Sequence, residues 1–289
     1  MYFRPIVSFD FHLHSDFSDG KLAPAALVAH VHAHNVTQMA LTDHDTLAGC
    51  DAAAAACAAL GIAFVPGVEL SVSWRGQSIH VIGLGVGLGQ QSDLSTGATA
   101  LHLHASDVVA RRRARVGQIA ARLQHRGRID ITAALDEMLR LPGVPTRMHV
   151  ARALVGAGHA KNVQDAFDRW LNHGRPGYAP VEWPDLVSSI SVLNAAGGKA
   201  VLAHPHRYRL SAGALRGLLG EFKAAGGSAM EVSVGGMSRN DLDRLATLAR
   251  RFGLRASAGS DFHDPAVPWN PPGRFAKLPA DLECIAEQL

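Results

Sequence analysis

Several kinds of residue are scarce in this chain of 289 residues, and their scarcity excludes several classes of protein. Cysteine occurs three times, at Cys50, Cys57 and Cys284, without the number or spacing of a disulfide framework or a zinc site. An odd, sparse set is typical of a reducing compartment, so we expect a cytoplasmic protein. No apolar run approaches the roughly 18 residues that a membrane span needs. Residues 1–11 are short and include Asp10, which is unlike a signal peptide.

The net charge of the chain is also small. Lys and Arg total 28 against 25 Asp and Glu, which leaves a net charge of +3. This bias is too weak to predict binding to long nucleic acid. A chain of this length can bury a full hydrophobic core without a structural metal ion to stabilise the fold. Any metal site is therefore expected to serve function rather than folding.

Histidine is abundant, with 16 copies, and the question is where these residues lie. Hydrophobic patterning predicts strands at residues 6–11, 38–42, 62–66, 78–84, 199–203, 228–233 and 255–258. It predicts helices at residues 23–34, 47–60, 212–225 and 240–252. Seven short strands alternating with helices indicate an α/β fold with a parallel sheet, closed or nearly closed.

The middle of the chain has a different pattern. From about residue 99 to 172 we find only helical patterns, flanked by glycine-rich segments at 83–97 and 174–184. We therefore expect one domain from residues 1–98 and 185–289, with a helical insertion (cap) domain at 99–184. The insertion carries a basic run with no acid among its members, which is typical of a solvated helix face. This run comprises Arg111, Arg112, Arg113, Arg115, Arg122, Arg126 and Arg128.

The first strand places two histidines on one side. Alternation in residues 9–14 puts Asp10, His12 and His14 on the same face, where two imidazoles can grip one cation. Other closely spaced histidines lie in helical patterns, where residues two apart point roughly 200° apart and cannot chelate together. We expect these on helix surfaces: His30, His32, His34, His102 and His104.

Further polar groups lie in the loop after the first predicted strand and in or after the other strands. They are Asp19, Asp43, His44, Glu69, His80, His204, Asp261 and His263. Each alone fits a capping residue, a turn or a hydrogen-bonded core histidine. In α/β barrels, however, the active site lies at the C-terminal ends of the strands. So many ligand-type groups at one mouth would repel each other and be poorly solvated unless cations held them.

These segments resemble, in order, the motifs of the PHP (polymerase and histidinol phosphatase) superfamily. The matching residues are His12-Leu13-His14-Ser15, Ser18-Asp19-Gly20, Thr42-Asp43-His44-Asp45, Pro66-Gly67-Val68-Glu69, His80, Ala203-His204-Pro205 and Gly259-Ser260-Asp261-Phe262-His263. Residues 145–154 and 174–178 also resemble a stand-alone subgroup that includes 3′,5′-nucleotide bisphosphate phosphatases. The resemblance implies a distorted (β/α)7 TIM-like barrel with a helical insertion.

The resemblance also implies a centre of three divalent ions. It assigns His12, His14, Glu69 and Asp261 to one ion. Glu69 would bridge to a second ion, which His80 and His204 complete. The third ion would be held by Asp19, His44 and His263. Mixed imidazole and carboxylate ligands suit Mn²⁺, Fe²⁺ or Zn²⁺, and the resemblance favours Mn²⁺.

The expected chemistry is phosphoester hydrolysis. A metal-bridging hydroxide would attack phosphorus in line. Asp43, His206 or Arg207 would assist, although Asp43 would alternatively orient a metal-bound histidine. Arg147 and His149 are expected to bind a second phosphate, and Tyr178 or Tyr208 to stack on a base; these four residues are predicted as the substrate-binding set.

The predicted reaction removes the 3′-phosphate of a small 3′,5′-nucleotide bisphosphate, such as adenosine 3′,5′-bisphosphate. The alternatives are a 5′-3′ exoribonuclease or phosphodiesterase on short oligonucleotides, hydrolysis of histidinol phosphate, and a non-catalytic PHP module. No membrane partner is expected, and the sequence leaves the oligomeric state open.

Overall fold

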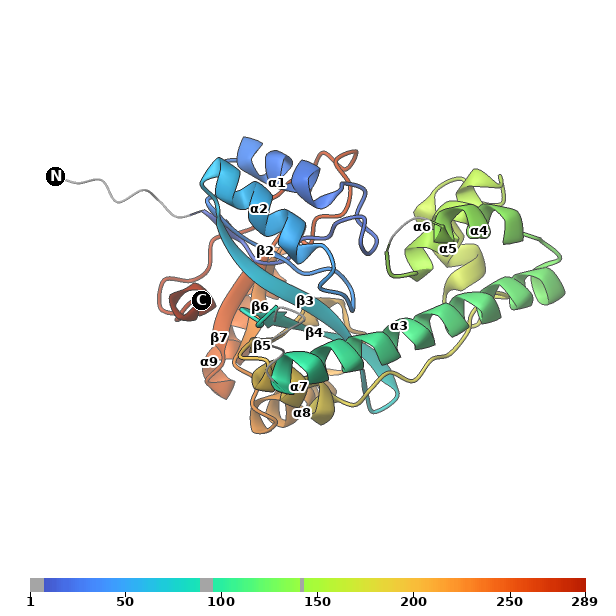
Figure 1. The fold of residues 1–289 in the computed structure, drawn as a ribbon. Helices are drawn as coiled ribbons and strands as arrows, with labels where there is room; N and C mark the ends of the chain where they lie inside the picture. The colour runs from blue at the N-terminus through green and yellow to red at the C-terminus, as the bar shows by residue number, and fades with distance from the viewer. Residues whose placement is uncertain (1–7, 89–95, 141–142) are drawn as a thin grey trace.

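The computed structural model describes residues 8–88, 96–140 and 143–289. The first two residues of the predicted strand at 6–11, and positions 89–95 of the glycine-rich segment at 83–97, lie outside the described residues. A seven-stranded sheet in the order β1 to β7 forms the centre (Figure 1). Its strands are β1 (Phe9–Asp10), β2 (Gln38–Leu41), β3 (Ala63–Trp74), β4 (Gln77–Leu84), β5 (Lys199–Leu202), β6 (Ala229–Val234) and β7 (Arg255–Gly259).

The two edges of the sheet come together. The Phe11 N–H donates to the Ala258 carbonyl at 3.3 Å, just beyond β1. Leu13 and Phe262 form a parallel bridge further along the same seam. The sheet is thus a nearly closed barrel surrounded by helices, which confirms the predicted distorted TIM-like fold.

The predicted all-parallel arrangement is wrong for one strand. β4 runs antiparallel to both β3 and β5. The cause is the two-residue connection Arg75-Gly76, in which both residues have positive φ (47° and 75°). Such a connection makes a tight hairpin, whereas parallel neighbours need a long crossover. β3 also continues to Trp74, so Glu69 lies within the strand and not after it as predicted.

The barrel helices are α1 (Pro24–Ala33), α2 (Cys50–Leu60), α7 (Leu186–Ala195), α8 (Ala212–Ala224) and α9 (Arg239–Phe252). Their apolar faces pack on the sheet; on α9, for example, Leu242 and Leu245 are buried. Gly61 ends α2 in a left-handed conformation (φ 68°), as the sequence predicts, because glycine adopts this conformation without steric cost.

Only helices and turns occur among the described residues 96–171. They are α3 (Thr96–Arg122), a π-helical turn (Leu123–Gly127), α4 (Thr132–Leu139), α5 (Arg147–Gly156), α6 (Val163–Ala166) and a second π-helical turn (Phe167–Leu171). Figure 1 shows α3 running from the barrel to a lobe built from α4, α5 and α6. Leu101 on α3 packs in the barrel core, while Ile119 and Leu123 join a separate apolar cluster with Leu154. Across residues 8–88, 96–140 and 143–289, no helix combines the length and apolar character of a membrane span.

The arginine run of α3 is only partly solvated. Arg111, Arg113, Arg126 and Arg128 are exposed, as expected. The expectation is wrong for Arg112, Arg115 and Arg122, which are buried or half-buried and, like Arg111, bind other parts of the chain. Arg112 is buried and pairs with Asp45, and Arg111, Arg115 and Arg122 donate to the carbonyls of Glu182, Ala179 and Tyr178. These bonds fasten the returning segment 178–182 along α3.

Candidate metal centre

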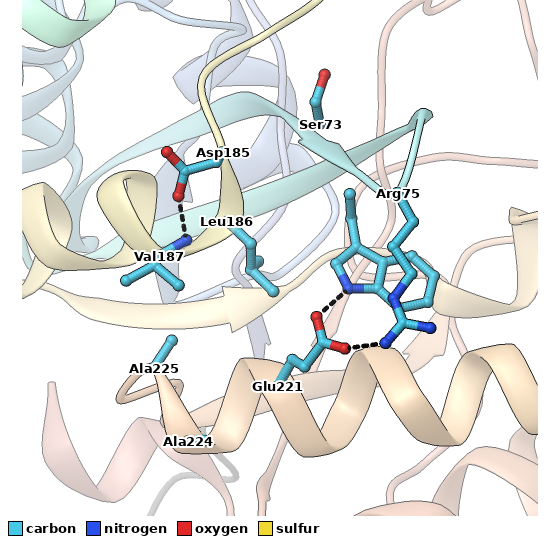
Figure 2. Close-up of a pocket in the computed structure, with 9 residues that line it drawn as sticks. Ser73, Arg75, Asp185, Leu186, Val187, Glu221, Ala224 and Ala225 are labelled. Carbon is cyan, nitrogen blue, oxygen red and sulfur yellow. Dashed lines mark hydrogen bonds and ion pairs between the residues drawn. The ribbon is translucent and has the colours of Figure 1, made fainter.

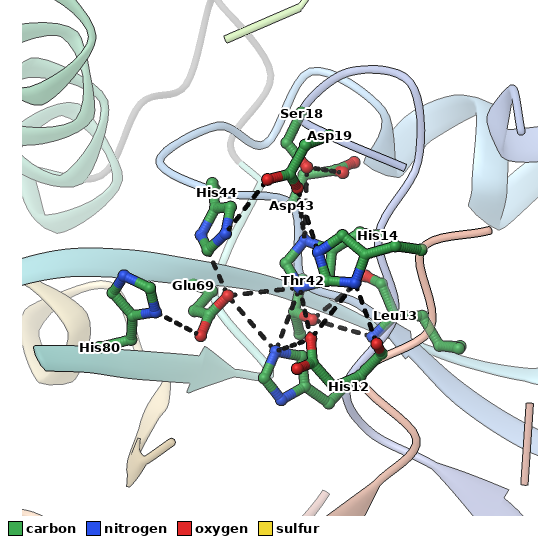
Figure 3. Close-up of polar contacts among 12 residues, drawn as sticks. His12, Leu13, His14, Ser18, Asp19, Thr42, Asp43, His44, Glu69 and His80 are labelled. Atoms are coloured by element: carbon green, nitrogen blue, oxygen red, sulfur yellow. Dashed lines mark hydrogen bonds and ion pairs between the residues drawn. The ribbon is translucent and has the colours of Figure 1, made fainter. Parts of the chain in front are cut away.

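The nine predicted ligands lie in one cluster around Glu69, whose two oxygens face different histidines (Figure 3). Its Oε2 lies 3.0 Å from His44 Nδ1 and 3.3 Å from the Nε2 atoms of His12 and His14. Its Oε1 lies 3.0 Å from His80 Nδ1 and 2.9 Å from His204 Nε2. Glu69 is therefore the central carboxylate of the cluster.

Two further carboxylates complete the cluster. Asp261 Oδ1 lies 3.3 Å from His12 Nε2 and His14 Nε2, and 3.5 Å from His263 Nδ1. Asp19 Oδ1 lies 3.2 Å from His263 Nε2, and its Oδ2 lies 3.8 Å from the Nε2 of His44. Each carboxylate is thus surrounded by imidazoles that come from different strands and loops.

The irregular strand β4 explains how His80 reaches the cluster. Because β4 is antiparallel, a residue near its start lies at the barrel end where the parallel strands finish. The register pairs His80 with Ser71, two positions after Glu69 on β3.

Two of the ligands have unusual backbone geometry. His204 and Asp261 follow β5 and β7 and have positive φ values of 27° and 55°. Residues with a Cβ rarely adopt this conformation, and such strain is typical of functional sites. Hydrogen bonds from their backbone N–H groups hold both residues: the His204 N–H donates to Glu231 Oε2 at 2.6 Å and the Asp261 N–H donates to the His12 carbonyl at 2.8 Å.

Glu231 is a site residue that the sequence reasoning missed. It is fully buried on β6, and its Oε1 lies 2.9 Å from His12 Nδ1 while its Oε2 accepts from the His204 N–H. One carboxylate therefore holds the ring of one candidate ligand and the backbone of another. The available signal was a single acid within the apolar strand 229–234, because a buried carboxylate requires partners.

The residues fit divalent cations. Since His12 Nδ1 points at Glu231, a neutral ring carries its proton there and leaves a lone pair on Nε2. That lone pair faces His14 Nε2 at 3.1 Å and two carboxylates, an arrangement that repels unless positive charge lies between them. In addition, the buried atoms Asp19 Oδ1 and His44 Nδ1 lie close to His263 and Glu69 but not in the geometry of a hydrogen bond. The implied sharing of the ligands among three ions stays a prediction.

The electrostatics of the cluster favour cations. Burial acts to lower the pKa of the His14 imidazole, but hydrogen bonds to Asp261 and Glu69 raise it to about 10. Burial acts to raise the pKa of Glu69, yet His44, His80 and His12 hold it well below its usual range. The carboxylates thus stay ionised and stabilise positive charge placed beside them.

Asp43 and Arg207 lie next to the cluster in different roles. Both oxygens of Asp43 are engaged by Ser15 and Ser18, and Ser18 Oγ lies 3.3 Å from His14 Nδ1. This placement suits the orienting role more than direct contact with a substrate. Arg207 Nη1 pairs with Asp261 Oδ2. Between His204 and Arg207, burial and both neighbours lower the pKa of His206 to about 4.

The four predicted substrate-binding residues are dispersed. The Arg147 guanidinium lies 5.2 Å from the Phe167 ring centre, and His149 Nδ1 accepts from the Thr146 N–H at the start of α5. Burial lowers the pKa of Arg147 while Tyr178 acts in the opposite direction. Tyr208 lies in the barrel wall, where its hydroxyl donates to the Ala203 carbonyl at 2.7 Å. Arg147, His149 and Tyr178 thus belong to the insertion and its return, and Tyr208 does not.

A separate open pocket of about 470 Å³ lies between the β3–β4 turn, the start of α7 and the end of α8 (Figure 2). Its charged groups are already paired: Glu221 accepts from the Trp74 indole and from Arg75, both at 2.6 Å. Asp185 caps α7 by accepting from the Val187 N–H. None of the nine predicted ligands lines it, so we do not assign it to the candidate centre.

Known proteins resemble the chain over nearly its whole length. The family model described as PHP domain matches residues 10–176. A 5′-3′ exoribonuclease Rnm of Salmonella typhimurium is 41% identical over 96% of this chain and 92% of its own length. A 3′,5′-nucleoside bisphosphate phosphatase of Chromobacterium violaceum is 37% identical over 98% of this chain and 97% of its own length.

A solved structure has the same fold. It is that of an amidohydrolase from Chromobacterium violaceum with bound sulfate, with a TM-score of 0.89 and 35% identity, covering 97% of this chain and 95% of that chain. The family model alone matches more than half of the chain. The chain therefore belongs to the PHP domain family and is a phosphoester hydrolase of that family.

Proposed function

We propose that this chain is a metal-dependent phosphatase that removes the 3′-phosphate of a 3′,5′-nucleotide bisphosphate, for example converting adenosine 3′,5′-bisphosphate to AMP and phosphate. The observation that carries the proposal is the gathering of nine imidazole and carboxylate side chains, with buried Glu69 at their centre. Divalent ions held there, Mn²⁺ by our proposal, would activate water and neutralise the charge of the phosphate.

The positions of Glu69 and Arg207 indicate what each would do in the reaction. The Oε1 side of Glu69 faces His80 and His204, and the Oε2 side faces His12, His14 and His44. This division supports a bridging role for Glu69. Arg207 is 43% exposed although it is paired with Asp261, so its guanidinium is accessible to a phosphoryl oxygen.

The insertion carries cations suited to a second phosphate. Burial, together with Arg147 and Arg112, lowers the pKa of the Arg115 guanidinium to about 10. Within the described parts of the chain, neither Arg115 nor Arg147 has a carboxylate in ion-pair contact. Crowded cations without an acid would be stabilised by a dianionic ligand. We assign Arg115 and Arg147 to the 5′-phosphate of the nucleotide.

A second candidate function is supported by the Salmonella relative, a 5′-3′ exoribonuclease at 41% identity. An exoribonuclease that releases 5′-mononucleotides breaks the bond between O3′ and phosphorus, which is the same bond that the phosphatase breaks. One centre can therefore act on both substrates if the space beyond the scissile phosphate accepts a second nucleotide.

We also propose domain boundaries and a cellular location for this chain. The separate apolar cluster of Ile119, Leu123 and Leu154 supports treating residues 99–184 as a cap on the barrel formed by 1–98 and 185–289. The three free cysteines suit the reducing cytoplasm.

A phosphate-release assay with Mn²⁺ tests the function. We expect fast release from adenosine 3′,5′-bisphosphate and little from AMP or histidinol phosphate. A 5′-phosphorylated RNA trimer, followed by chromatography of the products, tests the exoribonuclease alternative. Hydrolysis of the trimer without hydrolysis of the bisphosphate would replace the first proposal by the second. Inactivity on all four substrates with Mn²⁺ present would contradict both.

A further inference from the structure

We propose that the insertion is a structural part of the metal centre: Arg112 and Arg152 hold the two loops that carry His44 and Asp19. Binding of an ion at the group His14, Asp19, His44 and His263 would therefore depend on contacts made by the insertion. This inference rests on the proposed metal-dependent function.

Arg112 reaches from α3 into the barrel. Its Nε lies 2.6 Å from Asp45 Oδ2, and its Nη2 donates to Ser71 Oγ at 2.7 Å. Asp45 in turn accepts from the N–H of Ser71 at 2.7 Å. The guanidinium also lies 5.4 Å from the ring centre of Trp183, on the segment that returns from the insertion. Arg112 and Asp45 are both buried, so solvent does not replace these bonds.

The residue next to Asp45 is the candidate ligand His44. Asp45 has a positive φ of 53°, and its N–H donates to the Glu69 carbonyl at 3.0 Å. His44 itself forms a parallel bridge with Glu69. The Arg112 side chain thus fixes a strained turn that aligns His44 with the central carboxylate.

Arg152 makes the second contact, from α5. Its Nη2 donates to the carbonyl oxygen of Asp19 at 2.8 Å. The same loop is bound at Phe17, whose carbonyl accepts from the Val144 N–H at 2.9 Å. At Gly143 a Cβ atom would lie 2.6 Å from the Asp16 carbonyl, so the two segments approach too closely for a side chain. The insertion therefore holds the Asp19 loop along several residues.

Both contacts lead to the same group of ligands. Asp19 and His44 belong to the candidate group that also contains His14 and His263, and His44 lies in a further group with Glu69 and His80. The group of His12, Glu69 and His204 is tied instead by Glu231, which lies on β6 of the barrel. Loss of an insertion contact should therefore weaken most the ion held by His14, Asp19, His44 and His263, because His12 and His204 keep their support from Glu231 in the barrel.

The test is a titration of metal-depleted full-length protein with Mn²⁺ alone, followed by calorimetry and elemental analysis. The variants are Arg152→Met and Arg112→Lys, and Arg113→Met on the exposed side of α3 is the control. Arg152→Met leaves no buried acid unpaired. Arg112→Lys keeps the positive charge but cannot bind Asp45 and Ser71 through two nitrogens of a planar guanidinium. Both are therefore expected to fold, with circular dichroism as the check.

For both variants we expect one Mn²⁺ to bind roughly 10–100-fold more weakly, as for other partners that orient metal ligands. The remaining ions and the control should match the wild type. Unchanged Mn²⁺ binding in a folded Arg152→Met protein would overturn the inference, and so would equal weakening of all ions. Failure of the wild type to bind Mn²⁺ would instead refute the proposed function itself.

Discussion

At the scale of single residues, Glu69 bears the largest predicted effect. Its two oxygens face five histidines, and its pKa is held well below its usual range by His44, His80 and His12 against the effect of burial. Glu69→Gln removes this charge while keeping the side-chain shape. We expect kcat to fall by at least about 100-fold, more than the loss of an orienting partner alone, with the fold retained.

Steady-state kinetics and circular dichroism check this prediction. Glu221→Gln is the matched control, since Glu221 is an exposed carboxylate paired with Trp74 and Arg75. If the Glu69→Gln protein had the kcat of the wild type, Glu69 would have no role in the reaction.

Glu231→Gln tests a residue that the sequence did not identify. An amide can accept with only one of its two terminal atoms, whereas Glu231 serves both the His12 ring and the His204 N–H. We expect roughly 10–100-fold weaker Mn²⁺ binding, by the general effect of such orienting partners. Calorimetric titration measures it, and Mn²⁺ affinity equal to that of Glu221→Gln would contradict the assigned role.

The clustering of the nine residues could be predicted from the sequence because each lies in or after a predicted strand, in a segment that resembles a family motif. Glu231 and the Arg112–Asp45 pair could not. Their partners lie 219 and 67 positions away along the chain, and nothing local specifies which buried groups meet. Contacts between single polar residues that are distant in sequence can therefore be identified only once the three-dimensional structure is known.

At the scale of elements, the cap of α5 gives a prediction about stability. Thr146 is buried, and its Oγ1 accepts from the Met148 N–H at 3.1 Å at the start of this helix. Thr146→Ala should lower the free energy of unfolding by about 1 kcal/mol, the usual cost of losing an N-cap. Thr247→Ala, on the exposed middle of α9, is the control and should change it by only a few tenths of that amount.

Urea unfolding curves measure both differences. An effect of Thr146→Ala no larger than that of Thr247→Ala would show that the cap contributes little in this lobe.

The elements themselves were predicted well where periodicity decides them and poorly where connections do. Most strand and helix positions follow from local patterns, although the sequence predicts neither α7 nor the second half of β3. The direction of β4 depends on the tight turn at Arg75-Gly76, which those patterns do not identify as a hairpin. The sequence predicts a solvated face for the arginine run because the backbone partners of these side chains, such as the Ala179 carbonyl, carry no sequence signal.

At the scale of the whole molecule, the site links metal binding to stability. Ions that bind the folded chain and not the unfolded chain stabilise it by RT ln(1 + [L]/Kd), which is about 2.7 kcal/mol at 100 times Kd for one site. Mn²⁺ should therefore raise the Tm of metal-depleted protein, and a chelator should reverse the change. Calorimetric melting at several Mn²⁺ concentrations measures it, and a Tm independent of Mn²⁺ would contradict the proposed linkage.

The central claim is that side chains distant in sequence jointly bind several cations around Glu69. Elemental analysis of purified, Mn²⁺-loaded protein after removal of free metal tests it most directly. We predict more than one transition-metal ion per chain, up to the three that the family resemblance implies, and fewer in Glu69→Gln. A metal-free wild type that also releases no phosphate when Mn²⁺ is supplied would contradict the claim.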